Sequence, residues 1–190
     1  MNTELKTVTQ AFLKARLRPS TQVALRYSNG DKWMDISWPD YFRLSEKLGC
    51  ALADLGAKRG DRIAIMSNTC FQWVISDLAI LGIGCVTIPI YQNSTPEDIE
   101  FILNNSGAVA ALVEDRVQYE KLRRLRPRLP SLKSIGSFTP TNDDQVYSFQ
   151  ALLEKGDAFL RKQPQYFLQE CEFFFFATAA TEIYTSGTTG

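Results

Sequence analysis

Continuous apolar runs that alternate with amphipathic segments are the feature that most limits how this chain can fold. Three of these runs are Arg62–Met66, Cys85–Tyr91 and Ala108–Val113, and each is expected to form a buried strand. The segments between them carry apolar residues three and four positions apart, which is the spacing of a helix with one buried face. Buried strands joined by such helices form a parallel sheet with helices on both faces. The sequence therefore predicts an α/β fold built from βαβ units.

The rest of the chain is expected to form a hairpin, further helices and loops. Asn29 and Gly30 lie between two extended runs, 22–27 and 32–38, and this pattern predicts a small β-hairpin near the N-terminus. Pro39 opens a helix that ends at Gly56. Ser67, Asn68 or Thr69 is expected to cap a helix that runs to Leu81. The remaining expectations are helices over 95–107, 114–126 and 149–162, a short strand over 132–135, a polar loop over 138–146 and an irregular connector over 163–172.

The charge balance argues against a nucleic-acid-binding protein. Lys and Arg number 21, Asp and Glu number 21, and the formal net charge is zero, whereas a dedicated nucleic-acid binder is usually strongly basic. The basic run 121–128 is open to two interpretations, an anion-binding patch or a solvated helix face, and Leu122 and Leu125 favour the helix face. The chain has no histidine, which excludes His-ligated metals and Ser-His or Cys-His catalysis within it.

Cysteine usage and hydropathy indicate the cellular setting. The four cysteines form no CxxC pair and lie mostly in apolar stretches, as expected for buried, reduced thiols. No apolar run reaches the length of a membrane span, because polar residues and Pro89 interrupt the longest candidate, 70–91. We expect a cytoplasmic protein whose contact with a membrane is at most peripheral.

The last seven residues, Tyr184–Gly190, read YTSGTTG and follow an apolar extended run, Phe173–Thr181. Glycines allow backbone N–H groups to approach an anion closely, and hydroxyls donate to phosphate oxygens. A strand that leads into such a loop is typical of a nucleotide phosphate site, although no Walker A pattern is present. The alternative from composition alone is a Ser/Thr/Gly-rich surface turn.

Several segments together resemble the adenylate-forming (AMP-binding) superfamily of acyl-activating enzymes. YTSGTTG is similar to the family's phosphate-loop signature, and segments 38–68, 71–115 and 120–135 resemble its preceding blocks in the correct order. The resemblance covers Thr21 to Gly190, and within the family the sequence is most similar to long-chain fatty acid–CoA ligases. It implies the N-terminal subdomain of the adenylate-forming fold. One departure is that Phe173–Phe176 stands where the family has a polar lead-in to the loop.

The resemblance also implies a two-step reaction. A fatty acid carboxylate attacks the α-phosphate of ATP with Mg²⁺ present, and the thiol of CoA then displaces AMP from the acyl-adenylate. The residues that would hold the β- and γ-phosphates are Thr185, Ser186, Gly187, Thr188, Thr189 and Gly190, with Thr185 and Ser186 as the foremost hydroxyl donors. No catalytic residue and no metal ligand are expected within the chain.

The domain organisation follows from the same resemblance. Residues 1–20 are expected to form an N-terminal helical segment, and residues 21–190 the N-terminal portion of an AMP-binding domain that stops in the phosphate loop. The C-terminal domain and its catalytic lysine would lie downstream, so this portion alone is expected to be inactive. Two alternatives remain open: a fatty acyl–AMP ligase that passes its acyl group to a carrier protein, and a non-catalytic remnant that binds lipid or a protein partner.

Aromatic and amide residues offer further candidates for a binding cleft. Tyr91 and Gln92 follow the carboxyl end of an expected strand, where ligands bind in open α/β sheets. Trp33, Trp38 and Trp73 have two interpretations, an acyl pocket or core packing, and core packing is favoured.

Overall fold

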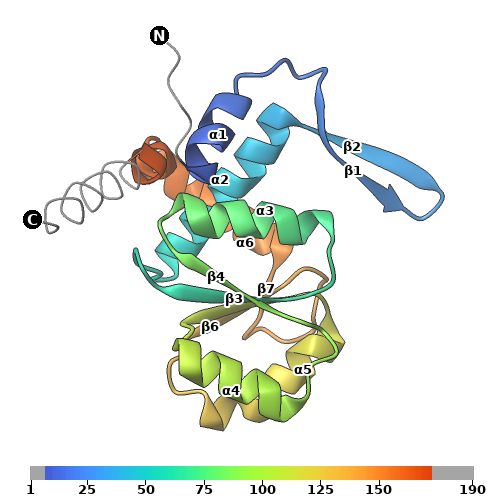
Figure 1. Ribbon diagram of the computed structural model, residues 1–190, viewed down its shortest axis with the longest axis vertical. Helices are drawn as coiled ribbons and strands as arrows, with labels where there is room; N and C mark the ends of the chain where they lie inside the picture. Colours follow the sequence, from blue (N-terminus) through green and yellow to red (C-terminus); the bar gives the residue numbers. More distant parts are fainter. Residues whose placement is uncertain (1–6, 173–190) are drawn as a thin grey trace, which may run out of the picture.

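A parallel five-stranded sheet forms the centre of the protein in the computed structural model (Figure 1). The structure describes residues 7–172. The strand order is β4-β3-β5-β6-β7, and every neighbouring pair is parallel. The strands are β3 (Arg62–Met66), β4 (Val86–Ile90), β5 (Ala110–Val113), β6 (Ser134–Ser137) and β7 (Tyr147–Ser148). The α/β fold predicted from the alternating apolar runs is confirmed.

Helices cover both faces of the sheet (Figure 1). One face packs against a hydrophobic cluster that includes Leu48, Ile80 and Leu152, and the other against a cluster that includes Ile99 and Leu122. The first face carries α1 (Val8–Ala15), α2 (Trp38–Asp54), α3 (Phe71–Gly82) and α6 (Phe149–Lys162), and the second carries α4 (Pro96–Ser106) and α5 (Arg116–Leu125). Within residues 7–172, no helix is both long and apolar enough to cross a membrane.

The predicted hairpin projects from one side of the body (Figure 1). Its strands, β1 (Val23–Asn29) and β2 (Lys32–Ser37), pair antiparallel around Gly30, whose φ of 65° lies in the left-handed region that favours glycine. Trp33 lies on β2 and is 71% exposed. Core packing is therefore wrong for this tryptophan, because Trp33 lies near the turn of the hairpin, away from the part of β2 that packs on the core through Ile36.

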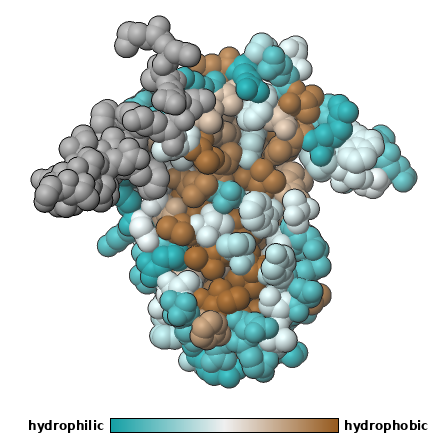
Figure 2. All heavy atoms as spheres, in the orientation of Figure 1, coloured by the Kyte–Doolittle hydropathy of each residue, from teal (hydrophilic) through white to brown (hydrophobic). Residues whose placement is uncertain are grey.

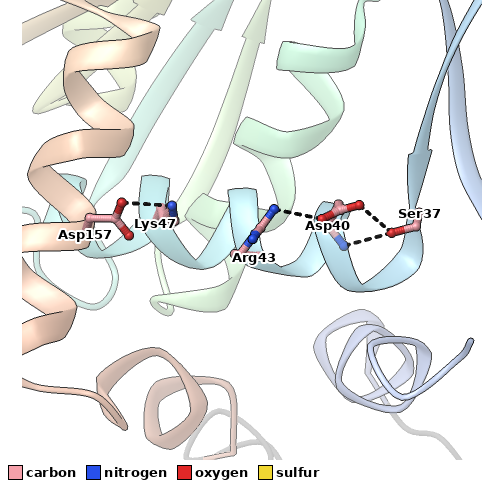
Figure 3. A network of polar contacts seen from close by, with 5 residues as sticks. All are labelled: Ser37, Asp40, Arg43, Lys47 and Asp157. Carbon is pink, nitrogen blue, oxygen red and sulfur yellow. Dashed lines mark hydrogen bonds and ion pairs between the residues drawn. The ribbon is translucent and has the colours of Figure 1, made fainter. Parts of the chain in front are cut away.

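Helix α2 begins with a complete N-cap and is tied to α6 (Figure 3). The Ser37 hydroxyl accepts from the Asp40 amide at 3.2 Å and donates to the Asp40 carboxylate at 2.7 Å. Arg43 pairs with the same carboxylate at 2.8 Å. Farther along α2, the Lys47 ammonium and the Asp157 carboxylate are 2.9 Å apart, which links α2 and α6.

The expected irregular connector over 163–172 is wrong, because residues 166–172 are helical. Phe167 from this segment is completely buried and meets Phe42 edge to face, with ring centroids 5.7 Å apart. It lies where α2 and α3 present Gly49 and Gly82, since a Cβ added to either glycine would be within 2.6 Å of the Phe167 ring. This contact joins residues far apart in the sequence, so local periodicity does not reveal it.

The basic run 121–128 forms a solvated helix face. Leu122 and Leu125 are buried, with 1% and 2% exposure. Arg123 pairs with Glu120 on the outer side of α5 at 2.8 Å. The interpretation as an amphipathic helix is confirmed.

Candidate functional site at the carboxyl edge of the sheet

The carboxyl ends of β3 and β4 open into a hollow of about 440 Å³. The loops that follow these two strands supply most of its walls, and α3 adds an aromatic ring. The lining residues are Ser67, Asn68, Thr69, Trp73, Pro89, Ile90, Tyr91, Gln92 and Asn93. Ligands of open α/β sheets bind at this edge, so the hollow is the candidate functional site.

A carboxylate from the neighbouring strand braces one wall of the hollow. Glu114, directly after β5, accepts from the Asn68 backbone amide at 2.7 Å and from the Asn68 side-chain amide at 3.4 Å. The Glu114 amide in turn donates to the Met66 carbonyl at 3.1 Å. These bonds hold the loop after β3 against the loop after β5, so that the wall is formed before any ligand arrives.

The opposite wall is held in a similar way. The Lys121 ammonium on α5 donates to the Gln92 carbonyl, and the Ser94 amide donates to the Tyr91 carbonyl at 3.0 Å, which closes a turn. Tyr91 itself is 84% exposed. Its ring is therefore available at the rim of the hollow for a ligand or another segment to pack against.

The chemistry of the hollow is neutral and polar. Among the residues that line it there is no Asp, Glu, Lys or Arg. Hydroxyls and amides from Ser67, Thr69 and Gln92 can donate and accept hydrogen bonds, and Trp73 and Tyr91 offer aromatic faces. This set fits a ligand group that is uncharged and polar or aromatic.

Helix α3 begins at this site without the cap that the sequence suggests. Ser67, Asn68 and Thr69 are the expected caps, but the helix starts at Phe71, and its N-cap Cys70 makes no side-chain capping bond. The Ser67 hydroxyl instead donates to the Asn68 carbonyl at 2.6 Å. The polar residues after β3 thus form a loop wall and leave the first amides of α3 without a side-chain cap.

The predicted site residues divide into two groups. Tyr91 and Gln92 line the hollow, as their place after a strand predicts, and Trp73 lines it as well while packing partly on the core. Trp38 packs against Tyr41 with ring centroids 6.1 Å apart, so its core interpretation is confirmed. The phosphate-loop candidates, residues 185–190, and the apolar run before them lie outside the described residues.

Sequence reasoning missed the residues after β3 as a binding wall. Polar residues directly after a buried strand are the signal that could have identified Ser67, Asn68 and Thr69. The brace from Glu114 depends on β3 and β5 being neighbours, and the sequence alone did not establish that order. Within residues 7–172, no group of three or more Cys, Asp or Glu side chains is placed to hold a metal ion.

The cysteines differ sharply in accessibility, and this gives a first test of the structure. Burial raises the pKa of Cys50, Cys85 and Cys171 to about 12, whereas Cys70, at the start of α3, is half-buried. We expect a thiol reagent at pH 8 to label the native protein first at Cys70, because the thiolate is the reacting species. Peptide mass mapping after brief labelling measures this, and Cys70→Ser should abolish the fast phase. Equal early labelling at Cys50 would contradict the described packing.

Comparison with known proteins finds relatives named as long-chain-fatty-acid–CoA ligases. It is 30% identical over 161 residues to the long-chain-fatty-acid–CoA ligase FadD15 of Mycobacterium bovis, which covers 83% of this chain and 25% of that protein. It is 28% identical over 195 residues to the long-chain-fatty-acid–CoA ligase ACSBG1 of Rattus norvegicus, covering 97% of this chain and 26% of that protein. The chain thus spans about a quarter of the length of these relatives.

Solved structures share the fold at lower identity. One is a putative long-chain-fatty-acid CoA ligase from Rhodopseudomonas palustris, with a TM-score of 0.68 and 18% identity over 77% of this chain and 36% of that chain. Another is the anthranilate CoA ligase AuaEII in complex with anthranoyl-AMP, with a TM-score of 0.67 and 22% identity over 75% of this chain and 27% of that chain. A sequence profile of the AMP-binding enzyme family matches residues 12–190. The chain therefore belongs to the AMP-binding enzyme family.

Proposed function

We propose that the protein takes part in ATP-dependent activation of a long-chain fatty acid, first to an acyl-adenylate and then to acyl-CoA. The observation that carries this proposal is the match of the AMP-binding enzyme family across residues 12–190, a range that includes YTSGTTG. Relatives named as long-chain-fatty-acid–CoA ligases support the acyl substrate. The preformed hollow at the carboxyl edge of the sheet supports a ligand site in this part of the protein.

In this proposal, the chain's own role is to bind and orient phosphates. The hydroxyls of Thr185 and Ser186 and the backbone amides of residues 187–190 donate hydrogen bonds to the β- and γ-phosphate oxygens of ATP. Mg²⁺ supplies neutralising charge to these phosphates when it is bound, and CoA supplies the accepting thiol. The carboxylate of the fatty acid is already ionised at neutral pH, so the residues of this chain need not act as a base.

The organisation of the whole protein belongs to the same proposal. Residues 1–20 would be a helical lead-in and residues 21–190 the N-terminal portion of the AMP-binding domain, with the remaining catalytic groups supplied from beyond this portion. We place the protein in the cytoplasm, with peripheral contact to a membrane.

Exchange of pyrophosphate with ATP tests the proposal directly. The protein is purified as the cell makes it, and its intact mass and C-terminal peptide are determined first. A mass well above 21.5 kDa makes the exchange assay the decisive experiment, and we expect exchange that depends on a long-chain fatty acid. Exchange only with amino or aromatic acids contradicts the substrate class.

The other outcomes of these measurements identify the alternatives. Fatty acid-dependent exchange without acyl-CoA formation identifies an acyl–AMP ligase with a carrier-protein acceptor. A stable protein whose mass matches 190 residues and that shows no exchange favours the non-catalytic alternative, and binding of lipid or of a protein partner is then the next measurement.

Ser186→Ala tests the predicted phosphate loop. A hydrogen bond to a charged group contributes about 1.5–3 kcal/mol, so we expect the exchange rate to fall by about 10- to 100-fold. The matched control is Ser131→Ala, which makes the same change at an exposed position before β6 and should leave the rate unchanged. An unaltered rate in Ser186→Ala contradicts a phosphate-binding role for this hydroxyl.

A further inference from the structure

We infer that the outer surface of α4 and α5 binds the same surface of a second copy of the protein, so that α4 of each copy packs on α5 of the other. The two helices lie side by side on the face of the sheet opposite α2 and α6 (Figure 1). The end of the molecule that they form is mostly hydrophilic, with isolated apolar groups among the polar ones (Figure 2). This inference does not depend on the proposed function.

Each of the two helices carries one exposed apolar side chain in a shallow hollow. On α4, Phe101 is 68% exposed and lines a hollow of about 560 Å³ together with Glu97. On α5, Val117 is 62% exposed and lines a hollow of about 460 Å³ together with Arg116 and Arg124. Single exposed apolar side chains are common on protein surfaces, so the charges around these two decide what can cover them.

The two hollows carry charges of opposite sign that are not used within one copy. Glu97 on α4 is exposed and makes no ion pair with any residue between 7 and 172, and the same holds for Arg116 and Arg124 on α5. The second carboxylate of the α4 hollow differs, because Glu100 pairs with Arg128 at 2.9 Å. The α4 hollow therefore offers a negative charge to a partner, and the α5 hollow offers positive charges.

The symmetry of this arrangement identifies the partner as a second copy. Both hollows lie on the outer side of the same helical layer, so within one copy they cannot close on each other. Each helix connects two parallel strands of one sheet, and α4 and α5 therefore run in the same direction. A two-fold axis along this direction, between the two helices, places α4 of one copy over α5 of the other. The contact then forms twice and closes the assembly at two copies.

The positions of the residues along the two helices fit this pairing. Both helices begin at the carboxyl edge of the sheet, α4 at Pro96 and α5 at Arg116. With a rise of about 1.5 Å per residue, Phe101 lies about 7.5 Å from the start of α4, and Val117 and Arg124 lie about 1.5 Å and 12 Å from the start of α5. When the two helix starts are level, Phe101 therefore enters the middle of the α5 hollow, and Glu97 meets Arg116.

The polar character of this surface sets the strength of the dimer. Ion pairs that remain near solvent contribute little, so we expect a dissociation constant in the micromolar range or weaker. Sedimentation velocity of the protein as the cell makes it should show the dimer growing with protein concentration. Raising the salt concentration from about 0.1 M to 1 M shortens the Debye length from about 10 Å to 3 Å and should weaken the dimer.

Charge reversal on each helix tests the pairing directly. Glu97→Arg places like charges opposite each other at both symmetry-related contacts, and Arg116→Glu does the same. We expect each variant alone to associate at least tenfold more weakly than the parent protein in sedimentation velocity. When the two variants are mixed in equal amounts, association should return, because residue 97 of each copy then meets an opposite charge at residue 116 of the other.

Glu154→Arg and Arg161→Glu are the matched controls, since they make the same two charge changes at exposed positions of α6 and should leave the dimer unchanged. Three results overturn the inference. They are a parent protein that stays monomeric at every concentration, a dimer that both reversals leave intact, and mixed variants that stay monomeric while circular dichroism shows that both are folded. None of these measurements needs ATP or a fatty acid, so the outcome is independent of the exchange assay.

Discussion

Phe167→Ala is expected to lower the free energy of unfolding by about 3–5 kcal/mol, the range for truncating a fully buried aromatic side chain. Phe167 is completely buried, and the two glycines that face its ring cannot fill the space that it leaves. Urea denaturation followed by circular dichroism measures the change.

Phe101→Ala is the matched control for this prediction. Phe101 lies on the outer side of α4 and is 68% exposed, so the same truncation there should change the free energy of unfolding by less than about 0.5 kcal/mol. Similar effects of the two substitutions would mean that residues 166–172 do not pack on α2 and α3 as described.

Gly156→Ala is expected to destabilise the protein by about 3 kcal/mol or more, at the upper end of overpacking effects. A Cβ on residue 156 would lie 1.8 Å from the backbone carbonyl oxygen of Lys47. Backbone cannot rotate away as a flexible side chain can. The pairs Lys47–Asp157 and Asp54–Lys155, at 2.9 Å and 2.8 Å, also hold α2 against α6 on both sides of the contact.

Thermal and urea unfolding of Gly156→Ala measure this effect, with Glu154→Ala as the control. Glu154 is exposed on the same helix, and alanine has a high helix propensity, so the control should remain near the stability of the parent protein. A Gly156→Ala protein that gains stability, as alanine normally confers on a helix, would show that α2 and α6 are farther apart than described.

Local patterns predicted the sheet and the hairpin well because both depend on neighbouring residues. Continuous apolar runs such as Arg62–Met66 and Ala110–Val113 can only be buried strands in this arrangement, and Asn29-Gly30 favours a tight turn wherever it joins two strands. The sequence also predicted that Tyr91 and Gln92 lie at a binding cleft, because they directly follow a strand that is easily recognised.

The contacts that the sequence did not reveal all join distant segments. The brace between Glu114 and Asn68 requires β5 to pair with β3, and the burial of Phe167 requires α2 and α3 to meet at two glycines. The segment 166–172 is also too short for its apolar residues to show a clear helical periodicity. Composition alone left YTSGTTG as a phosphate loop or a surface turn, and resemblance to a family was needed to choose between them.

The two glycines that face Phe167 have a consequence for how such sequences can diverge. A Cβ at Gly82 would lie 2.2 Å from the Phe167 ring, and one at Gly49 would lie 2.6 Å from it. A larger residue at either position is compatible with this packing only if position 167 becomes smaller in the same lineage. Position 49 is constrained further, because a Cβ there would also lie 2.9 Å from the Ala79 backbone oxygen. Across homologous genes, positions 82 and 167 should therefore change together, and their covariation would trace this packing in relatives whose structures are unknown.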